Sequence, residues 1–246
     1  MIEITRTSHR VVAAAAVVMA AFAAASPADA GRTPRANFGM DFAARRPVSA
    51  TAIHLTILYK GRDPNAKPSP IRKIVLNAPR GTRFHTAALP RCGASDQQLL
   101  AEGDAACPRA SRLGSGTLTA MTGFPGPAGT VVTKVTVFNT ATGNVEVVKE
   151  ASTGKPVATD RFRIRGRTWI AHPPDTPGGP PDGKTAVRRI DFTYAPKARW
   201  AVTPPKCPSR GYWRSTAAFT YADGVTAHVS DRTPCKQPAH GTVRRR

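Results

Sequence analysis

Apolar and polar residues alternate along much of the chain beyond residue 50. In the segment 51–59, Ile53, Leu55 and Ile57 occupy every second position, with His54 and Thr56 between them. A period of two is typical of a strand that buries one face. Similar runs, separated by turns rich in Gly and Pro, predict further strands at 71–77, 116–121, 130–139, 144–149, 160–171, 185–194, 200–203, 212–221 and 225–230.

The segment between Cys92 and Cys107 carries a helix signal. Ser95 can accept a hydrogen bond from the backbone three residues on, and Gln98 can reach back to the Ser95 backbone, which together make a capping box. Two leucines then give the segment an apolar side, and Gly103 is a suitable stop. We therefore expect one helix of about seven residues inside this loop.

These signals together predict an all-β fold, namely a β-sandwich of the immunoglobulin-like or a similar kind, with one short helix. We expect a single domain over 49–236, in which the Pro- and Gly-rich segment 173–184 is a long surface loop. Residues 31–48 are polar and irregular and predict a flexible arm, while 237–246 predict a basic tail. Two small β-domains that divide near Pro173 are the alternative.

The N-terminus has the three-part layout of a secretory signal peptide. Arg6, His9 and Arg10 are cationic, 11–25 is uncharged and apolar, and an A-x-A pattern ends at Ala30. A membrane anchor is the alternative, but this apolar run is too short to cross a hydrocarbon core of about 30 Å as a helix. We expect cleavage after Ala30, a secreted or cell-surface location, and no transmembrane span in the mature chain.

Cysteine usage agrees with export. The mature part holds four cysteines, and an even number in an exported chain indicates disulfides. Three pairings are possible. We favour Cys92–Cys107 with Cys207–Cys235, because each pair brackets a local excursion beside Pro and Gly. A zinc site is disfavoured, since the cysteines form no pair of CxxC knuckles and no His pair at zinc spacing accompanies them.

The net charge is strongly positive, because 36 Lys and Arg face 15 Asp and Glu, which gives +21. Such an excess implies an anionic partner or strong self-repulsion. Four arginines alternate with other residues in one predicted strand: Arg161, Arg163, Arg165 and Arg167. On a strand they share one face at a spacing of about 6.6 Å, which suits phosphates or carboxylates repeated along a polymer. The alternative is an ordinary solvated face opposite buried Phe162 and Ile164.

No motif indicates a catalytic or metal-binding site. The Gly-Ser-Gly run at 114–116 lacks the spacing of a nucleophile elbow, and neither HExxH nor a Gly-rich phosphate loop is present. Asp191 and Asp223 are the carboxylates associated with strands, and Asp223 is explained by its hairpin turn with Gly224. The histidines beyond the leader are isolated in sequence: His54, His85, His172, His228 and His240. We expect no metal and no cofactor, although dispersed residues can still meet in space.

Several short segments form a recognisable set. They are PRGTRF at 79–84, LPRC at 89–92, ACPRAS at 106–111, LGSG at 113–116, TPPKCP at 203–208, Trp213, FTYADG at 219–224 and PC at 234–235. The set resembles a group of uncharacterised secreted proteins of GC-rich Gram-positive bacteria, over roughly 48–235. The resemblance implies a β-fold with paired cysteines. The group has no assigned activity, so the resemblance implies no functional residue.

These features predict an exported, non-enzymatic β-domain protein that binds an anionic polymer or surface of the cell envelope or the extracellular space. Export argues against chromosomal DNA as the partner. One alternative is a secreted hydrolase whose site is assembled from dispersed residues, and another is a surface structural protein with no specific ligand. A shallow basic face favours the binding protein, and a deep cleft lined by His and Asp favours the hydrolase.

Overall fold

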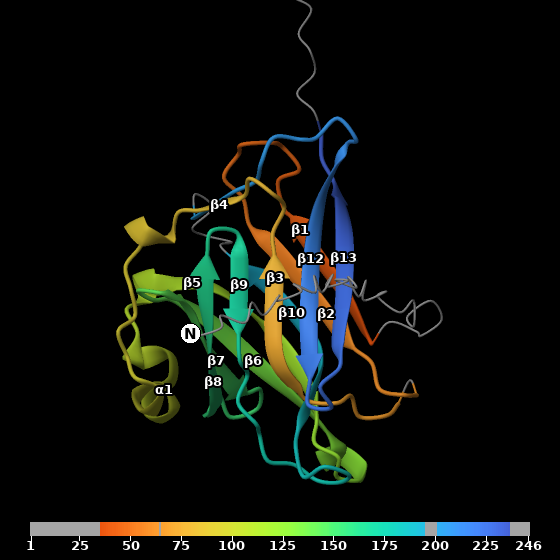
Figure 1. Ribbon diagram of the computed structural model, residues 1–246. Helices are drawn as coiled ribbons and strands as arrows, with labels where there is room; N and C mark the ends of the chain where they lie inside the picture. The colour runs from red at the N-terminus through yellow and green to blue at the C-terminus, as the bar shows by residue number, and fades with distance from the viewer. Residues whose placement is uncertain (1–34, 64, 195–200, 237–246) are drawn as a thin grey trace, which may run out of the picture. The chain divides into compact units, whose positions relative to one another are not determined.

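The computed structural model describes residues 35–63, 65–194 and 201–236. Within them, eleven strands form one antiparallel sheet in the order β1-β2-β10-β5-β6-β7-β8-β9-β3-β12-β13 (Figure 1). Their bounds are β1 Ala36–Phe42, β2 Ile53–Tyr59, β3 Ile71–Asn77, β5 Arg112–Met121, β6 Thr130–Asn139, β7 Gly143–Glu150, β8 Pro156–Arg165, β9 Thr168–Ala171, β10 Ala186–Tyr194, β12 Tyr212–Tyr221 and β13 Thr226–Pro234. A second sheet pairs β4 (Arg83–Phe84) with β11 (Val202–Thr203).

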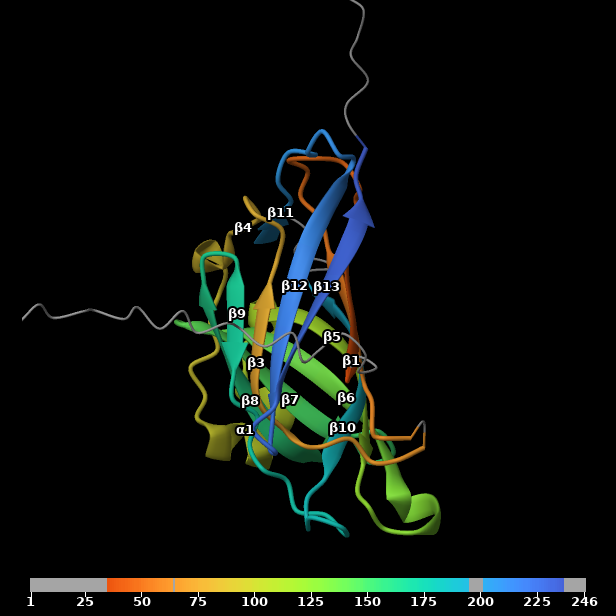
Figure 2. The same ribbon diagram turned by 45° about the vertical axis from the view of Figure 1, so that its right-hand side comes forward.

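The two ends of the large sheet, β1 and β13, lie side by side, so the sheet curls into a nearly closed barrel (Figure 2). Side chains join this seam: the Met40 N–H donates to Asp231 Oδ2 at 2.9 Å, and the Thr233 hydroxyl donates to the Met40 carbonyl at 2.7 Å. The predicted β-sandwich is therefore wrong. Alternation does not distinguish the two architectures, because sandwiches and barrels both bury one face of each strand.

The Thr233→Val substitution is expected to lower the free energy of unfolding by about 1 to 2 kcal/mol. Thr233 is 1% exposed and Met40 is fully buried, so the Met40 carbonyl would lose its donor without gaining water. Urea denaturation of the two proteins measures the difference. Thr226→Val on the same strand is the matched control, because Thr226 is exposed. Equal losses for the two variants would show that the seam bond contributes nothing.

Aromatic side chains fill one end of the barrel. Phe42 and Trp213 meet edge to face with ring centroids 5.1 Å apart. Trp169 packs against Tyr194 at 5.3 Å, and Phe84 of the small sheet packs against Trp169 at 5.2 Å. Such contacts add to the free energy of burying the rings. This end of the interior is therefore a packed core.

Both disulfides pair as the sequence predicts. Cys92 and Cys107 have a Cα–Cα distance of 5.0 Å, and Cys207 and Cys235 have one of 5.7 Å. These distances lie within the ordinary range of a disulfide. The two disulfides are consistent with an extracellular protein.

The predicted helix is confirmed as α1 (Asp96–Glu102), and a 3₁₀ turn (Gly103–Ala106) continues it. The Gln98 N–H donates to Ser95 Oγ at 3.2 Å, and the Ser95 N–H donates to Gln98 Oε1 at 2.9 Å, so the capping box is present. Leu99 is fully buried and packs, together with the first disulfide, against two valines on the outer face of β7. Other 3₁₀ turns are Thr86–Ala88, Arg109–Ser111 and Gly126–Gly129.

The strand β1 lies in the segment for which the sequence predicted a flexible arm. Every second side chain of β1 is buried, and the strand pairs with β2 along its length. The arm prediction is therefore wrong for these residues. Alternation is present there, but Gly39 and the Arg-rich flanks weigh against a strand in a reading of the sequence. The predicted leader, 1–30, and the predicted tail, 237–246, lie outside the described residues.

The predicted strand at 160–171 is a hairpin of two strands. β8 begins earlier, at Pro156, and the chain reverses at Gly166, whose φ of 57° suits a glycine. Arg165 then pairs with Thr168 across a turn of two residues. The inward positions are even-numbered in β8, as for Ile164, and odd-numbered in β9, as for its partner Trp169, so the phase of the alternation changes at this turn.

Candidate functional site

Three of the four predicted arginines form an exposed row on β8. Arg161, Arg163 and Arg165 are exposed, while Phe162 and Ile164 are half-buried and pack against the barrel core. The alternation along β8 thus separates an outer cationic face from an inner apolar face, as expected of a strand with one buried side.

Arg167 does not belong to this row. It lies in the turn between β8 and β9, is half-buried, and its guanidinium donates a hydrogen bond to the Ala78 carbonyl. The Ala78 N–H in turn donates to the Arg167 carbonyl at 3.1 Å. Arg167 therefore ties the hairpin to the end of β3, and the predicted ladder of four arginines is reduced to three.

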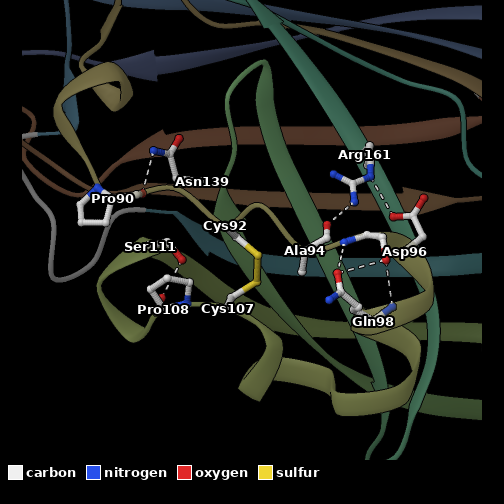
Figure 3. The surroundings of a disulfide bond; sticks show 11 residues. Pro90, Cys92, Ala94, Asp96, Gln98, Cys107, Pro108, Ser111, Asn139 and Arg161 are labelled. Carbon is white, nitrogen blue, oxygen red and sulfur yellow. Dashed lines mark hydrogen bonds and ion pairs between the residues drawn. A yellow bond between two sulfur atoms is a disulfide. The ribbon is translucent and has the colours of Figure 1, made fainter.

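Arg161 has a partner on α1. Its Nε donates to Asp96 Oδ1 at 2.8 Å, and its Nη2 donates to the Ala94 carbonyl at 2.9 Å (Figure 3). The side chains of the ion pair are 43% and 55% exposed, so the pair contributes little to stability. It does fix the start of α1 against β8. Among the described residues, the guanidinium groups of Arg163 and Arg165 have no hydrogen-bonding or ionic partner.

A groove of about 940 Å³ follows the row of three arginines. Lys73 of β3 and His172, which follows β9, also line it. Its lining includes three carboxyl groups, but each is accounted for. Asp96 pairs with Arg161, and Asp175 pairs with Lys184 at 2.5 Å. Asp160 faces Glu146 on the adjacent strand and is half-buried. The groove thus keeps an excess of unpaired cationic groups. We call it the β8 groove.

The Pro-rich loop at one end of the β8 groove is held in place by Lys67. Its Nζ donates to Asp182 Oδ1 at 2.6 Å and to the Lys184 carbonyl at 2.7 Å, and its side chain is 7% exposed. Burial alone would raise the pKa of Asp182, but the hydrogen bonds and charge of Lys67 lower it below its ordinary value. Lys67 therefore anchors the predicted surface loop to the segment that precedes β3.

The other carboxylates and histidines that the sequence singles out lie on separate elements of the fold. Hydrogen bonds and charge from Arg189 lower the pKa of Asp191, which lies at 2.5 Å from that guanidinium. Asp223 occupies its turn, where it accepts the Val225 N–H at 3.1 Å and pairs with Arg35 at 2.7 Å. In the described ranges, no three His, Cys, Asp or Glu side chains gather in a way that could hold a metal ion.

Sequence reasoning missed two inward-facing carboxyl groups. Glu146 of β7 and Asp160 of β8 lie directly opposite each other in the strand register. Burial and the neighbouring Asp160 raise the pKa of Glu146 to about 8. Burial, together with the charge of Asp96, raises the pKa of Asp160 to about 6 against a backbone hydrogen bond from Arg161. The signal was available, because Asp160 shares its parity with Phe162.

No family model, curated protein or solved structure matches this chain. The resemblance to secreted Gram-positive proteins therefore stays an expectation. Over the described residues, no helix combines the length and apolar character needed to cross a membrane.

Proposed function

We propose that this protein is exported and binds an anionic polymer of the cell envelope or the extracellular space in the β8 groove. The observation that carries the proposal is the pair Arg163 and Arg165, whose side chains are exposed and have no partner among the described residues. Lys73 and His172 extend the same lining. Charge excess across the whole chain, at +21, adds long-range attraction.

The geometry of a strand suits a repeating ligand. Arg163 and Arg165 are two residues apart, which places their side chains about 6.6 Å from each other along one face. Each guanidinium offers a planar fork of donors that matches the two oxygens of a phosphate or a carboxylate. A chain of regularly spaced anions can therefore occupy both forks at once.

Hydrolysis is the less supported function. Catalysis by a nucleophile or by water needs a base within hydrogen-bonding reach, and that base is oriented by a third group. In the part of the chain that the structure describes, no histidine hydrogen-bonds to a carboxylate, and His172 of the β8 groove has no hydrogen-bonding partner. The β8 groove thus lacks the relay that a hydrolase of this type uses.

The Arg163→Ser/Arg165→Ser variant is expected to bind labelled polyphosphate at least tenfold more weakly than the wild type at low salt. The slope of log affinity against log salt should fall by about 1.5, because fewer counterions are released. Fluorescence anisotropy over a sodium chloride series measures both. The melting temperature should stay nearly unchanged, since both side chains are exposed.

The control for this experiment is Arg80→Ser/Arg214→Ser. Both arginines are exposed and lie outside the β8 groove, so the control removes the same two charges from elsewhere. We expect it to keep most of the affinity. Equal weakening by the two double variants would refute a local site and leave only non-specific attraction. Binding that does not depend on salt would refute the electrostatic proposal altogether.

A further inference from the structure

The barrel is not packed along its whole interior. At the end opposite the aromatic core, a cavity of about 320 Å³ lies under the Pro-rich loop. Its wall is largely apolar and includes Ile71, Ile74, Leu118, Val148, Val187 and Ile190. The volume is at the lower end of the range found for small-molecule sites, which are mostly apolar with a few polar groups. We call it the barrel cavity.

The polar groups of the barrel cavity have few partners. Glu146 has no hydrogen bond or ion pair to another described residue, and its half-buried side chain lines the cavity. The Tyr59 hydroxyl is buried without a hydrogen-bonding partner and lines the same space. Asp160 accepts only the backbone N–H of Arg161. Buried polar groups are ordinarily satisfied, so this group of three calls for a partner that the chain does not supply.

The barrel cavity is acidic in a strongly basic protein. Four carboxyl groups line it, those of Glu146, Glu150, Asp160 and Asp175, and no Lys, Arg or His of the described residues is among its lining. Two of the four have partners, because Glu150 accepts the Thr153 hydroxyl at 2.6 Å and Asp175 pairs with Lys184. Glu146 and Asp160 remain, side by side and turned inward.

We propose that the barrel cavity binds a small apolar molecule that carries one protonated amine, with the amine held between Glu146, Asp160 and Tyr59. The apolar wall packs against the apolar part of the molecule, and the carboxyl groups pair with its charged amine. An anion is repelled by the same groups, and a neutral apolar molecule leaves them unpaired. A bare metal ion finds too few ligands here. Asp160 lines both spaces, but the amine site lies on the inner face of β8 whereas Arg163 and Arg165 lie on its outer face, and the test of the site does not depend on the proposed function.

The position of the barrel cavity gives it a route to solvent. The cavity and the β8 groove share the lining residues Pro174, Asp175 and Thr176 of the Pro-rich loop. The mouth of the cavity therefore opens beside the groove, next to the loop that Lys67 fastens. A ligand can reach Glu146 past this loop without the barrel seam opening.

Isothermal titration with octylamine, octanol and octanoate tests the proposal, because these probes share an apolar chain and differ in charge. In buffered sodium chloride above pH 8, octylamine should bind with one-to-one stoichiometry and at least tenfold more tightly than octanol. Octanoate should not compete with octylamine for the cavity. Failure of octylamine to bind, or equal affinity for octanoate, would overturn the proposal. Equal affinity for octanol would show an apolar cavity without a charge-recognising site and would also overturn it.

Variants then locate the charge recognition. Glu146→Gln and, separately, Asp160→Asn should each weaken octylamine binding at least tenfold and leave octanol binding unchanged. Glu102→Gln on the exposed end of α1 is the matched control and should change neither. Arg163→Ser/Arg165→Ser should also leave octylamine affinity within twofold, which separates this site from the β8 groove. Unchanged octylamine affinity in both carboxyl variants would overturn the assignment.

The pH dependence of octylamine binding gives a second readout. The titratable groups that line the cavity with Glu146 are Tyr59 on β2, Glu150 on β7, Asp160 on β8 and Asp175 in the Pro-rich loop. Burial raises the pKa of Glu146 to about 8. Below that pH the carboxyl group is protonated and must lose its proton before it can pair with a cation. Affinity should therefore rise from pH 6 to pH 8, and the binding enthalpy should vary with the ionisation enthalpy of the buffer. A flat pH profile would overturn the role of Glu146.

Discussion

At pH 8 the Glu146→Gln variant is expected to be more stable than the wild-type protein, by on the order of 4 kcal/mol. Burial raises the pKa of Glu146 from 4.5 to about 8 in the folded state, while the unfolded chain keeps the ordinary value. Below pH 4.5 both states hold the proton and the carboxyl has no effect. Between the two values the unfolded state alone releases it, so stability is lost as the pH rises. Glutamine cannot ionise and removes this loss.

Thermal unfolding at pH 4.5 and at pH 8 tests this result. The two proteins should melt at similar temperatures at the lower pH, and the variant should melt roughly 10 °C higher at pH 8. The exposed substitution Glu102→Gln should shift neither value by more than a degree or two. A Glu146→Gln variant that is destabilised at pH 8 would mean that the wild-type carboxylate is paired in the folded protein.

Replacing Trp213 with alanine is expected to lower the free energy of unfolding by about 3 to 5 kcal/mol. Trp213 is 1% exposed and is among the largest fully buried side chains of the described residues. Its ring lies 5.1 Å from that of Phe42, and its Nε1 donates to the Lys206 carbonyl at 3.2 Å. The alanine variant therefore leaves a cavity at the packed end of the barrel and an acceptor without its donor.

Urea denaturation measures the loss, and Trp213→Phe serves as the matched variant. Phenylalanine keeps an aromatic ring against Phe42 but lacks the donor to Lys206, so it should cost clearly less than alanine. If alanine and phenylalanine cost the same, the hydrogen bond would matter and the packing would not. A loss below about 1 kcal/mol for alanine would contradict the packed aromatic core.

Local features of the sequence predicted local features of the fold. The strands predicted at 71–77, 130–139 and 212–221 coincide with β3, β6 and β12 to the residue. The capping box located the start of α1, and the cysteine spacing favoured the observed pairing. Each of these signals depends on residues that lie close together in the chain, where backbone preference and side-chain spacing decide the outcome.

Closure of the barrel could not be predicted in the same way. It depends on contacts such as that of Met40 with Asp231, which are 191 positions apart. The candidate site shows the same division. The outward direction of Arg161, Arg163 and Arg165 follows from strand alternation, whereas the turn at Gly166 removes Arg167 from the row. The space around Glu146 depends on which strands surround it, and no single segment of the sequence specifies that.

The seam between β1 and β13 also has a consequence for the order of folding. Its two strands come from opposite ends of the described chain. During synthesis from the N-terminus, β1 and β2 are therefore made long before β13. During that interval the outer edge of β1 is open to pairing with another molecule. Asp41 places a carboxylate on that edge strand, and the arginines that flank β1 add charge of the opposite sign. Charges at an exposed edge discourage such pairing until Asp231 and Thr233 arrive to cover it.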